Sequence, residues 1–255
     1  MRILVEDGFE DCCKLAADMI LETIRNKPNA HVGLATGSSA QGVYPYLVQA
    51  YAAGKADFSK VSSINLDEYV GLGPEHPQSY RRFMDENLFN HINIRKGNTY
   101  VAKGTGDIDA NLAEFHNMLT KRYRDIQLLG IGVNGHIAFN EPGPFLCGGP
   151  HLVHLDPSTI EANARFFSDP KEVPREAISM GMEDIMRAKR IVLLAAGESK
   201  AKAIAGLVLD ERIDTRNPST MLKMHPDATI LLTRKLADRI GYDAKRNGCL
   251  QDGIA

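Results

Sequence analysis

Tryptophan is absent from this 255-residue sequence, cysteine occurs only four times, and the formal net charge is only −2. A chain with so little net charge has no strong field to attract nucleic acid or an acidic membrane surface, so we expect neither as a partner. Cys12 and Cys13 are adjacent, Cys147 and Cys249 stand alone, and no CxxC pair occurs. This spacing predicts neither a disulfide framework nor a zinc site, and it fits the reducing cytoplasm.

Long apolar segments are also missing. No run approaches the roughly 18 apolar residues that a membrane span needs, and residues 1–9 carry acidic groups too early for a signal peptide. With 44% hydrophobic residues, the chain is nevertheless long enough to bury a large core. We therefore expect a cytoplasmic globular protein.

Short apolar runs alternate with amphipathic stretches along the chain. The apolar runs predict strands at 2–5, 31–35, 61–66, 98–101, 126–131, 190–195 and 228–233. Helical spacing predicts helices at 11–26, 41–53, 78–91, 108–123, 200–209 and 234–240. Strands that alternate with helices in this way are typical of a parallel sheet. We predict one α/β domain over residues 1–255, with an open, mainly parallel twisted sheet and helices on both faces in a Rossmann-like, three-layer arrangement. Residues 143–150 predict a loop, and residues 245–255 form a tail without a clear pattern.

Ligands of such sheets bind beyond the carboxyl ends of the strands, and the first informative strand end reads "ATGSS". A glycine allows a tight turn, and the hydroxyls and free N–H groups at the following helix start suit an anion. The segment is neither a P-loop nor a GxGxxG motif, so a nucleotide is not favoured. Phosphate binding and simple helix capping by serine explain it equally well at this point. The candidate residues are Thr36, Gly37, Ser38 and Ser39.

A second strand end carries the acid pair Asp67-Glu68. A carboxylate in this position is well placed to act as a base. An isolated acid pair is more often a helix cap or a solvated surface feature. The pair therefore needs support from the rest of the chain.

The third strand end reads "GIGVNGHIAFNEPG", where Gly130, Gly132 and Gly135 predict a tight path around His136 and Glu141. The spacing does not match an HExxH metal site and no second histidine lies nearby, so we expect no metal. A histidine–carboxylate pair for proton transfer near neutral pH is the better interpretation. A histidine that satisfies buried backbone groups is the alternative.

Two basic residues complete the set of candidate site residues. Lys200 follows a strand at a helix start, where a bound anion would relieve its conflict with the helix dipole. Arg165 stands beside two phenylalanines, and its guanidinium is suited to phosphate pairing. A solvated lysine and a structural arginine–carboxylate bridge are the alternatives. Together, the four strand ends favour a small phosphorylated substrate that undergoes proton transfer.

Five segments, in the same order and over nearly the whole chain, resemble the glucosamine-6-phosphate deaminase (isomerase) family. They are "LATGSSAQGVY", "NLDEYVGLGPEHPQSYRRFM", "LGIGVNGHIAFNEPG", "ANARFFSD" and "AAGESKAKAI". The resemblance implies that D-glucosamine 6-phosphate and water are converted to D-fructose 6-phosphate and ammonia, without a metal or an organic cofactor.

The resemblance also implies a role for each matching residue. Asp67 matches the base that moves the C2 proton to C1 through an enolamine. His136 matches the acid/base that opens the sugar ring, and Glu141 matches the carboxylate that orients it. The phosphate site is matched by Thr36, Gly37, Ser38, Ser39, Arg165 and Lys200.

The chain departs from the family in two places. Asn134 stands where the best-known bacterial members carry aspartate; we expect an orienting role near His136 and an altered pH profile. Residues 144–155 lack the serine and paired basic residues that allosteric members use to bind N-acetylglucosamine 6-phosphate. We therefore expect simple saturation kinetics.

Other functions remain open. A galactosamine-6-phosphate deaminase would reuse nearly all of these residues. A 6-phosphogluconolactonase needs no C2 base such as Asp67. A non-catalytic sugar-phosphate sensor normally carries a DNA-binding helix-turn-helix, and we expect none here because the α/β pattern starts at Arg2. The expected partner is a small sugar phosphate, and the sequence leaves open whether the protein is a monomer or a homo-oligomer.

Overall fold

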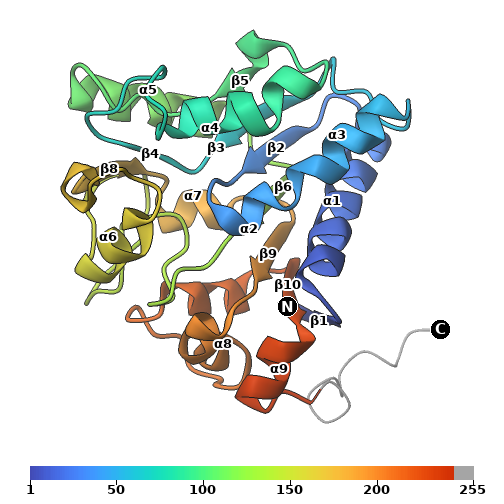
Figure 1. Cartoon of the computed structure of the whole chain (residues 1–255), viewed down its shortest axis with the longest axis vertical. Coiled ribbons are helices and arrows are strands. Elements are labelled where there is room, and N and C mark those ends of the chain that lie inside the picture. The colour runs from blue at the N-terminus through green and yellow to red at the C-terminus, as the bar shows by residue number, and fades with distance from the viewer. Residues whose placement is uncertain (244–255) are drawn as a thin grey trace.

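A seven-stranded sheet forms the centre of the protein, with the strand order β1-β10-β9-β6-β2-β3-β5 (Figure 1). The structure is a computed structural model that describes residues 1–243. Every neighbouring pair in this sheet is parallel. The strands are β1 (Arg2–Glu6), β2 (His31–Leu34), β3 (Ser62–Asn65), β5 (Thr99–Tyr100), β6 (Ile126–Leu129), β9 (Ile191–Ala195) and β10 (Ala228–Thr233).

Helices flank this sheet. The α-helices are α1 (Phe9–Asn26), α2 (Ser38–Gln41), α3 (Tyr44–Ala52), α4 (Tyr80–Asn87), α5 (Ile108–Lys121), α6 (Pro157–Ala164), α7 (Met182–Met186), α8 (Ala201–Val208) and α9 (Arg234–Ile240). Short 3-10 turns are η1 (Phe89–His91), η2 (Lys96–Asn98), η3 (Pro170–Glu172), η4 (Glu198–Lys200) and η5 (Pro218–Met224).

Both faces of the sheet are covered. Every residue of β2, β6, β9 and β10 is buried, and successive side chains of a strand point to opposite faces. Helix α1 packs against β1, β6, β9 and β10, and α9 packs against β1 and β10. The predicted open, mainly parallel α/β fold is therefore confirmed.

A second, three-stranded antiparallel sheet was not predicted from the sequence. It has the order β4-β8-β7 and consists of β4 (Asp67–Tyr69), β8 (Glu176–Ser179) and β7 (His151–His154). These strands contain no continuous apolar run of the kind that predicted the main sheet, and β7 is half exposed. Strands β7 and β8 and helix α6 lie to one side of the main sheet, away from α1 (Figure 1). Helices α6 and α7 were also not predicted.

The expected strands and helices of the main sheet are all present, with shifted ends. The helix expected at 41–53 is α3, which begins at Tyr44. The separate helix α2 ends at Gln41, and Pro45 in the first turn of α3 has no N–H to continue that preceding helix. The helix expected at 78–91 ends at Asn87 and is followed by η1. Residues 143–150 contain no helix or strand, as predicted.

The tail expected at 245–255 lies outside the described residues, as does Cys249. The assignment of residues 1–255 to one domain stays a prediction. Within residues 1–243, no helix is both long enough and apolar enough to cross a membrane.

Candidate active site

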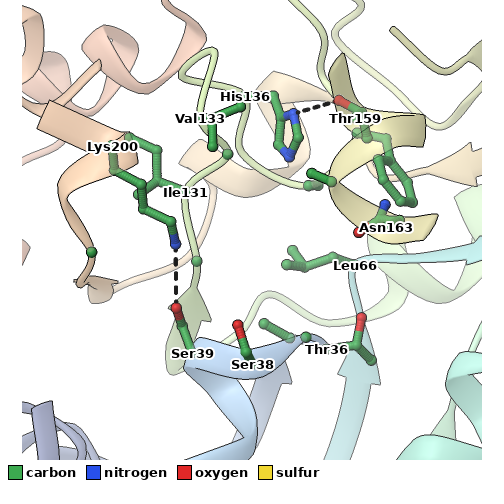
Figure 2. Close-up of a pocket in the computed structure, with 18 of the residues that line it drawn as sticks. Thr36, Ser38, Ser39, Leu66, Ile131, Val133, His136, Thr159, Asn163 and Lys200 are labelled. Carbon is green, nitrogen blue, oxygen red and sulfur yellow. Dashed lines mark hydrogen bonds between the residues drawn. The ribbon is translucent and has the colours of Figure 1, made fainter. Parts of the chain in front are cut away.

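A cavity of about 630 Å³ opens where the strands of the main sheet end. Eight of the ten predicted site residues line it, namely Thr36, Gly37, Ser38, Ser39, Asp67, His136, Arg165 and Lys200. The other two, Asn134 and Glu141, lie behind His136 and contact it. Figure 2 shows Ser38, Ser39 and Lys200 on one side of the cavity and His136 with Thr159 on the other.

Two cations converge on the serine loop. Lys200 Nζ lies 3.4 Å from Ser39 Oγ, and Arg165 Nη2 lies 3.4 Å from Ser38 Oγ. Burial and the neighbouring Arg165 charge lower the pKa of Lys200 to about 8. Neither cation forms an ion pair with a residue in the described part of the chain. This end of the cavity therefore carries uncompensated positive charge that suits a phosphate dianion.

The helix-capping alternative for the serine loop is wrong. Gly37 occupies the N-cap of α2 with a φ of 90°, and no side chain caps this helix. This left-handed region of backbone conformation favours glycine. The hydroxyls of Ser38 and Ser39 instead face the two cations.

Asp67 opens β4, where the chain leaves the main sheet and pairs with Ser179 of β8. Its side chain is buried but lines the cavity. Burial and the charge of Glu68 raise the pKa of Asp67 to about 8. A carboxylate with a pKa in this range is a strong enough base to remove a proton from carbon.

Glu68 has a different task from its neighbour. Its carboxylate accepts hydrogen bonds from the backbone N–H groups of Tyr69, Tyr80 and Arg81, at 2.9, 2.9 and 3.0 Å. The last two bonds satisfy free N–H groups at the start of α4. The capping alternative is thus correct for Glu68, while Asp67 faces the cavity.

His136 forms a network with three side chains. Its Nδ1 lies 3.3 Å from Glu141 Oε2 and 3.3 Å from Thr159 Oγ1. Asn134 Nδ2 donates to Glu141 Oε2 at 2.8 Å, and Asn134 Oδ1 accepts from the backbone N–H of His136 at 3.1 Å. Burial disfavours the charged form of Glu141. The hydrogen bond and the charge of His136 outweigh this effect, with smaller contributions from Thr159 and Asn134, so the pKa of Glu141 lies below its ordinary value.

Two glycines allow this arrangement. A Cβ on Gly132 would lie 2.4 Å from Cε1 of His136, so the backbone lies directly against the imidazole. Gly135 has a φ of 92°, and a Cβ there would lie 2.1 Å from Asn217 Oδ1. Gly130, by contrast, has open space around it. The expected tight path is therefore real at Gly132 and Gly135 but not at Gly130.

Among the cavity-lining residues that were not predicted are three polar ones from α4 and α6, namely Tyr80, Thr159 and Asn163. Tyr80 follows a predicted strand end by more than ten residues, and α6 was not predicted at all. Nothing in their local sequence marks them as part of the site, because only the folding of the small sheet brings α6 here.

Metal ligands are not gathered at this site. Among residues 1–243, no group of three or more histidine, cysteine, aspartate or glutamate side chains is placed to hold a metal ion. The absence of a cofactor remains a prediction.

The chain belongs to the family of glucosamine-6-phosphate isomerases and 6-phosphogluconolactonases, whose family model matches residues 6–231. Several curated relatives are named glucosamine-6-phosphate deaminase. One from Clostridium beijerinckii is 48% identical over 242 residues, which cover 94% of this chain and 100% of the relative. Another, from Thermoanaerobacter pseudethanolicus, is 45% identical and covers 94% of this chain and 95% of the relative.

Solved structures agree with this membership. A structure described as a monomeric glucosamine-6-phosphate deaminase has a TM-score of 0.91 and 36% identity, and covers 94% of this chain and 100% of that one. The 6-phosphogluconolactonase of Trypanosoma cruzi has a TM-score of 0.72 but only 16% identity, with 93% of this chain and 96% of that one covered. The second likeness concerns the fold alone.

Proposed function

We propose that this protein is a glucosamine-6-phosphate deaminase that converts D-glucosamine 6-phosphate and water to D-fructose 6-phosphate and ammonia. One observation carries the proposal: two separate acid/base groups, Asp67 and His136, face the same cavity as two unpaired cations, Arg165 and Lys200. The names of the relatives, at 45–48% identity, support the same activity.

The phosphate of the substrate binds between the serine loop and the two cations. Thr36, Ser38 and Ser39 supply hydroxyls, and Gly37 keeps the backbone open. Lys200 and Arg165 supply the charge. Because these groups do not take part in bond breaking, the binding energy of the phosphate serves to hold the sugar against Asp67 and His136.

His136 opens the ring in the first chemical step. The C2 hydrogen of an aldose becomes acidic only after the ring opens, so one group has to move the C1 hydroxyl proton to the ring oxygen. Nδ1 of His136 faces Glu141 and Thr159, which leaves Nε2 for this transfer. Glu141 holds the imidazole in place, and Asn134 holds Glu141.

Asp67 performs the second step. Its carboxylate removes the C2 proton while a proton of the substrate's own 2-ammonium group moves to the C1 carbonyl oxygen, which produces a neutral enolamine. Return of the proton to C1 gives a 2-imino sugar. Water then adds at C2 and ammonia leaves, so the net reaction consumes one water and yields one ketose phosphate.

The alternatives have less support. A galactosamine-6-phosphate deaminase differs only in the epimer at C4, and no described contact selects that epimer. The lactonase structures share the fold at 16% identity, and a lactone hydrolase has no use for the Asp67 base. A sensor would not need two acid/base groups in one cavity.

Ammonia release from glucosamine 6-phosphate tests the proposal. The wild-type protein and Asp18→Asn, a change on the exposed face of α1, are expected to release ammonia and fructose 6-phosphate together. Asp67→Asn is expected to lose at least about 10²-fold in kcat, because a catalytic base of this kind contributes that much.

Substrate comparison separates the remaining alternatives. Faster turnover of galactosamine 6-phosphate would favour the epimer, and turnover of 6-phosphogluconolactone would favour the lactonase. Binding of glucosamine 6-phosphate without ammonia release would favour the sensor. Full activity of Asp67→Asn would remove Asp67 from the mechanism.

We also propose that the enzyme works in the cytoplasm without a metal. Its thiols at Cys12, Cys13 and Cys147 are free, as suits a reducing compartment. Protein treated with a chelator and then freed of it is expected to retain its full rate.

A further inference from the structure

Thr159 has an unusual place in α6. It is the buried residue of this helix, with 2% of its surface exposed, while the other α6 residues are exposed or half-buried. Helices normally attach to a protein body through apolar side chains. In α6 the half-buried Ile160 makes such an apolar contact, but the fully buried side chain carries a hydroxyl, and this hydroxyl points at His136 (Figure 2).

The hydroxyl has two partners at once. Thr159 Oγ1 lies 3.3 Å from Nδ1 of His136, and Thr159 also stabilises the charged form of Glu141, which helps to lower the pKa of that carboxyl. A hydroxyl has one proton to donate and lone pairs to accept with. Since ionised Glu141 can only accept, Thr159 donates to Glu141 and accepts from His136.

We propose that Thr159 is a positioning residue that keeps the proton of the neutral His136 imidazole on Nδ1. Acceptance by Thr159 requires that Nδ1 carries a hydrogen, and Glu141 accepts the same hydrogen at 3.3 Å. The second ring nitrogen then keeps its lone pair for the sugar. Figure 2 shows this nitrogen on the side of the ring that faces the cavity.

The two acceptors complement each other. Glu141 alone leaves the ring free to rotate about one long hydrogen bond. Thr159 approaches Nδ1 from a different element, α6, and Gly132 lies against Cε1 of the ring. The three contacts together restrict the tilt of the imidazole, which matters because small displacements of a proton-transfer group are costly.

A pair of substitutions tests this role, which rests on the proposed deaminase activity. Thr159→Val keeps the shape and removes the hydroxyl, and Thr159→Ser keeps the hydroxyl and removes a methyl group. Thr120→Val is the matched control, because Thr120 is an exposed helical threonine whose hydroxyl bonds the carbonyl of His116. We expect Thr159→Val to lower kcat by about tenfold or more with KM changed less than about twofold, as for a residue that aids proton transfer only. Thr159→Ser and Thr120→Val are expected to stay within about threefold of wild type.

A second measurement is independent of turnover. With 15N-labelled histidine, the nitrogen chemical shifts of His136 report which ring nitrogen carries the proton. The wild-type protein is expected to show a proton on Nδ1, and Thr159→Val is expected to show a mixture of the two tautomers.

The outcomes distinguish the two proposals. If the wild-type protein releases no ammonia, the proposed function fails, whatever the histidine signals show. If the wild type is active, an unchanged kcat and tautomer in Thr159→Val would overturn the role of Thr159. Equal losses in Thr159→Val and Thr159→Ser would also overturn it, because packing rather than the hydroxyl would then matter.

Discussion

Asn134 contacts Glu141 rather than the imidazole of His136. Its Nδ2 donates to Glu141 Oε2 at 2.8 Å, so the amide acts on the histidine through the carboxylate. The expected orienting role near His136 therefore takes a specific form: Asn134 fixes the side chain that in turn faces the imidazole.

Asn134→Asp tests this relationship. The substitution keeps an acceptor for the backbone N–H of His136 but replaces the donor to Glu141 with a second carboxylate. Two carboxylates at this distance share a proton, so the pKa of Glu141 rises. We expect kcat to fall more steeply at acidic pH than in the wild type, because Glu141 then takes up a proton in addition to Asp67, while the products stay the same. Asn117→Leu, on the exposed side of α5, is the control; superimposable profiles for Asn134→Asp and wild type would contradict the assignment.

The pH dependence of kcat/KM is expected to have a narrow maximum near pH 8. Below this pH, Asp67, with a pKa of about 8, is protonated and cannot accept the C2 proton. Above it, Lys200, also with a pKa of about 8, loses the charge that holds the phosphate. Since kcat/KM reports the free enzyme, both limbs appear in a plot of log kcat/KM against pH.

Lys200→Arg isolates the alkaline limb. An arginine stays protonated throughout this range, so the alkaline limb is expected to move up while the acidic limb stays in place. An alkaline limb that remains near pH 8 in this variant would assign it to a group other than Lys200.

Asp67 is expected to make the fold less stable at neutral and alkaline pH. Its pKa is 3.8 as an ordinary carboxyl and about 8 in the folded protein. Between these values the folded state keeps a proton that the unfolded chain has lost. The free energy of unfolding is therefore highest below pH 4. It falls by about 1.4 kcal/mol per pH unit between pH 4 and pH 8, and it levels off above pH 8.

Urea unfolding of Asp67→Asn measures this cost. The variant is expected to match wild type at pH 4, where both side chains are neutral, and to be several kcal/mol more stable at pH 8. An equal or lower free energy of unfolding at pH 8 would mean that the buried carboxylate is not held at the expense of stability.

Gly132→Ala is expected to displace His136. The added Cβ would lie 2.4 Å from Cε1 of the ring, and backbone at this point cannot move without moving the loop. We expect kcat to fall by about 10²-fold, as for a misplaced catalytic group. Gly97→Ala is the control, because Gly97 has ordinary φ and open space around it. A kcat for Gly132→Ala within threefold of the control would show that the imidazole is not confined by this contact.

The rate is expected to rise hyperbolically with glucosamine 6-phosphate. Residues 143–150 carry no lysine or arginine, so this loop has no cation to hold a second sugar phosphate. Initial rates with and without N-acetylglucosamine 6-phosphate check this. A sigmoidal curve that the acetylated sugar converts to a hyperbola would show that an activating site exists after all.

Local sequence pattern was enough to predict the main sheet and most of the candidate residues that line the cavity. Thr36 and His136 lie in the loops that follow β2 and β6, two strands that are buried along their whole length, and Lys200 follows the buried strand β9. In a parallel sheet the carboxyl ends of neighbouring strands lie at one edge, so the topology alone brings these residues together. Their position after a recognisable strand is therefore enough to place these residues at this edge, before the fold is known.

Asp67, Glu68 and Thr159 needed the tertiary structure. The two acidic residues are neighbours in an apolar context, yet pairing of β4 with β8 turns Asp67 toward the cavity and places Glu68 at the start of α4. Thr159 reaches His136 from a helix that has no strong apolar stripe of its own. Short strands and weakly amphipathic helices bury too little surface to leave a periodic signal, so their positions depend on long-range contacts that no local pattern encodes.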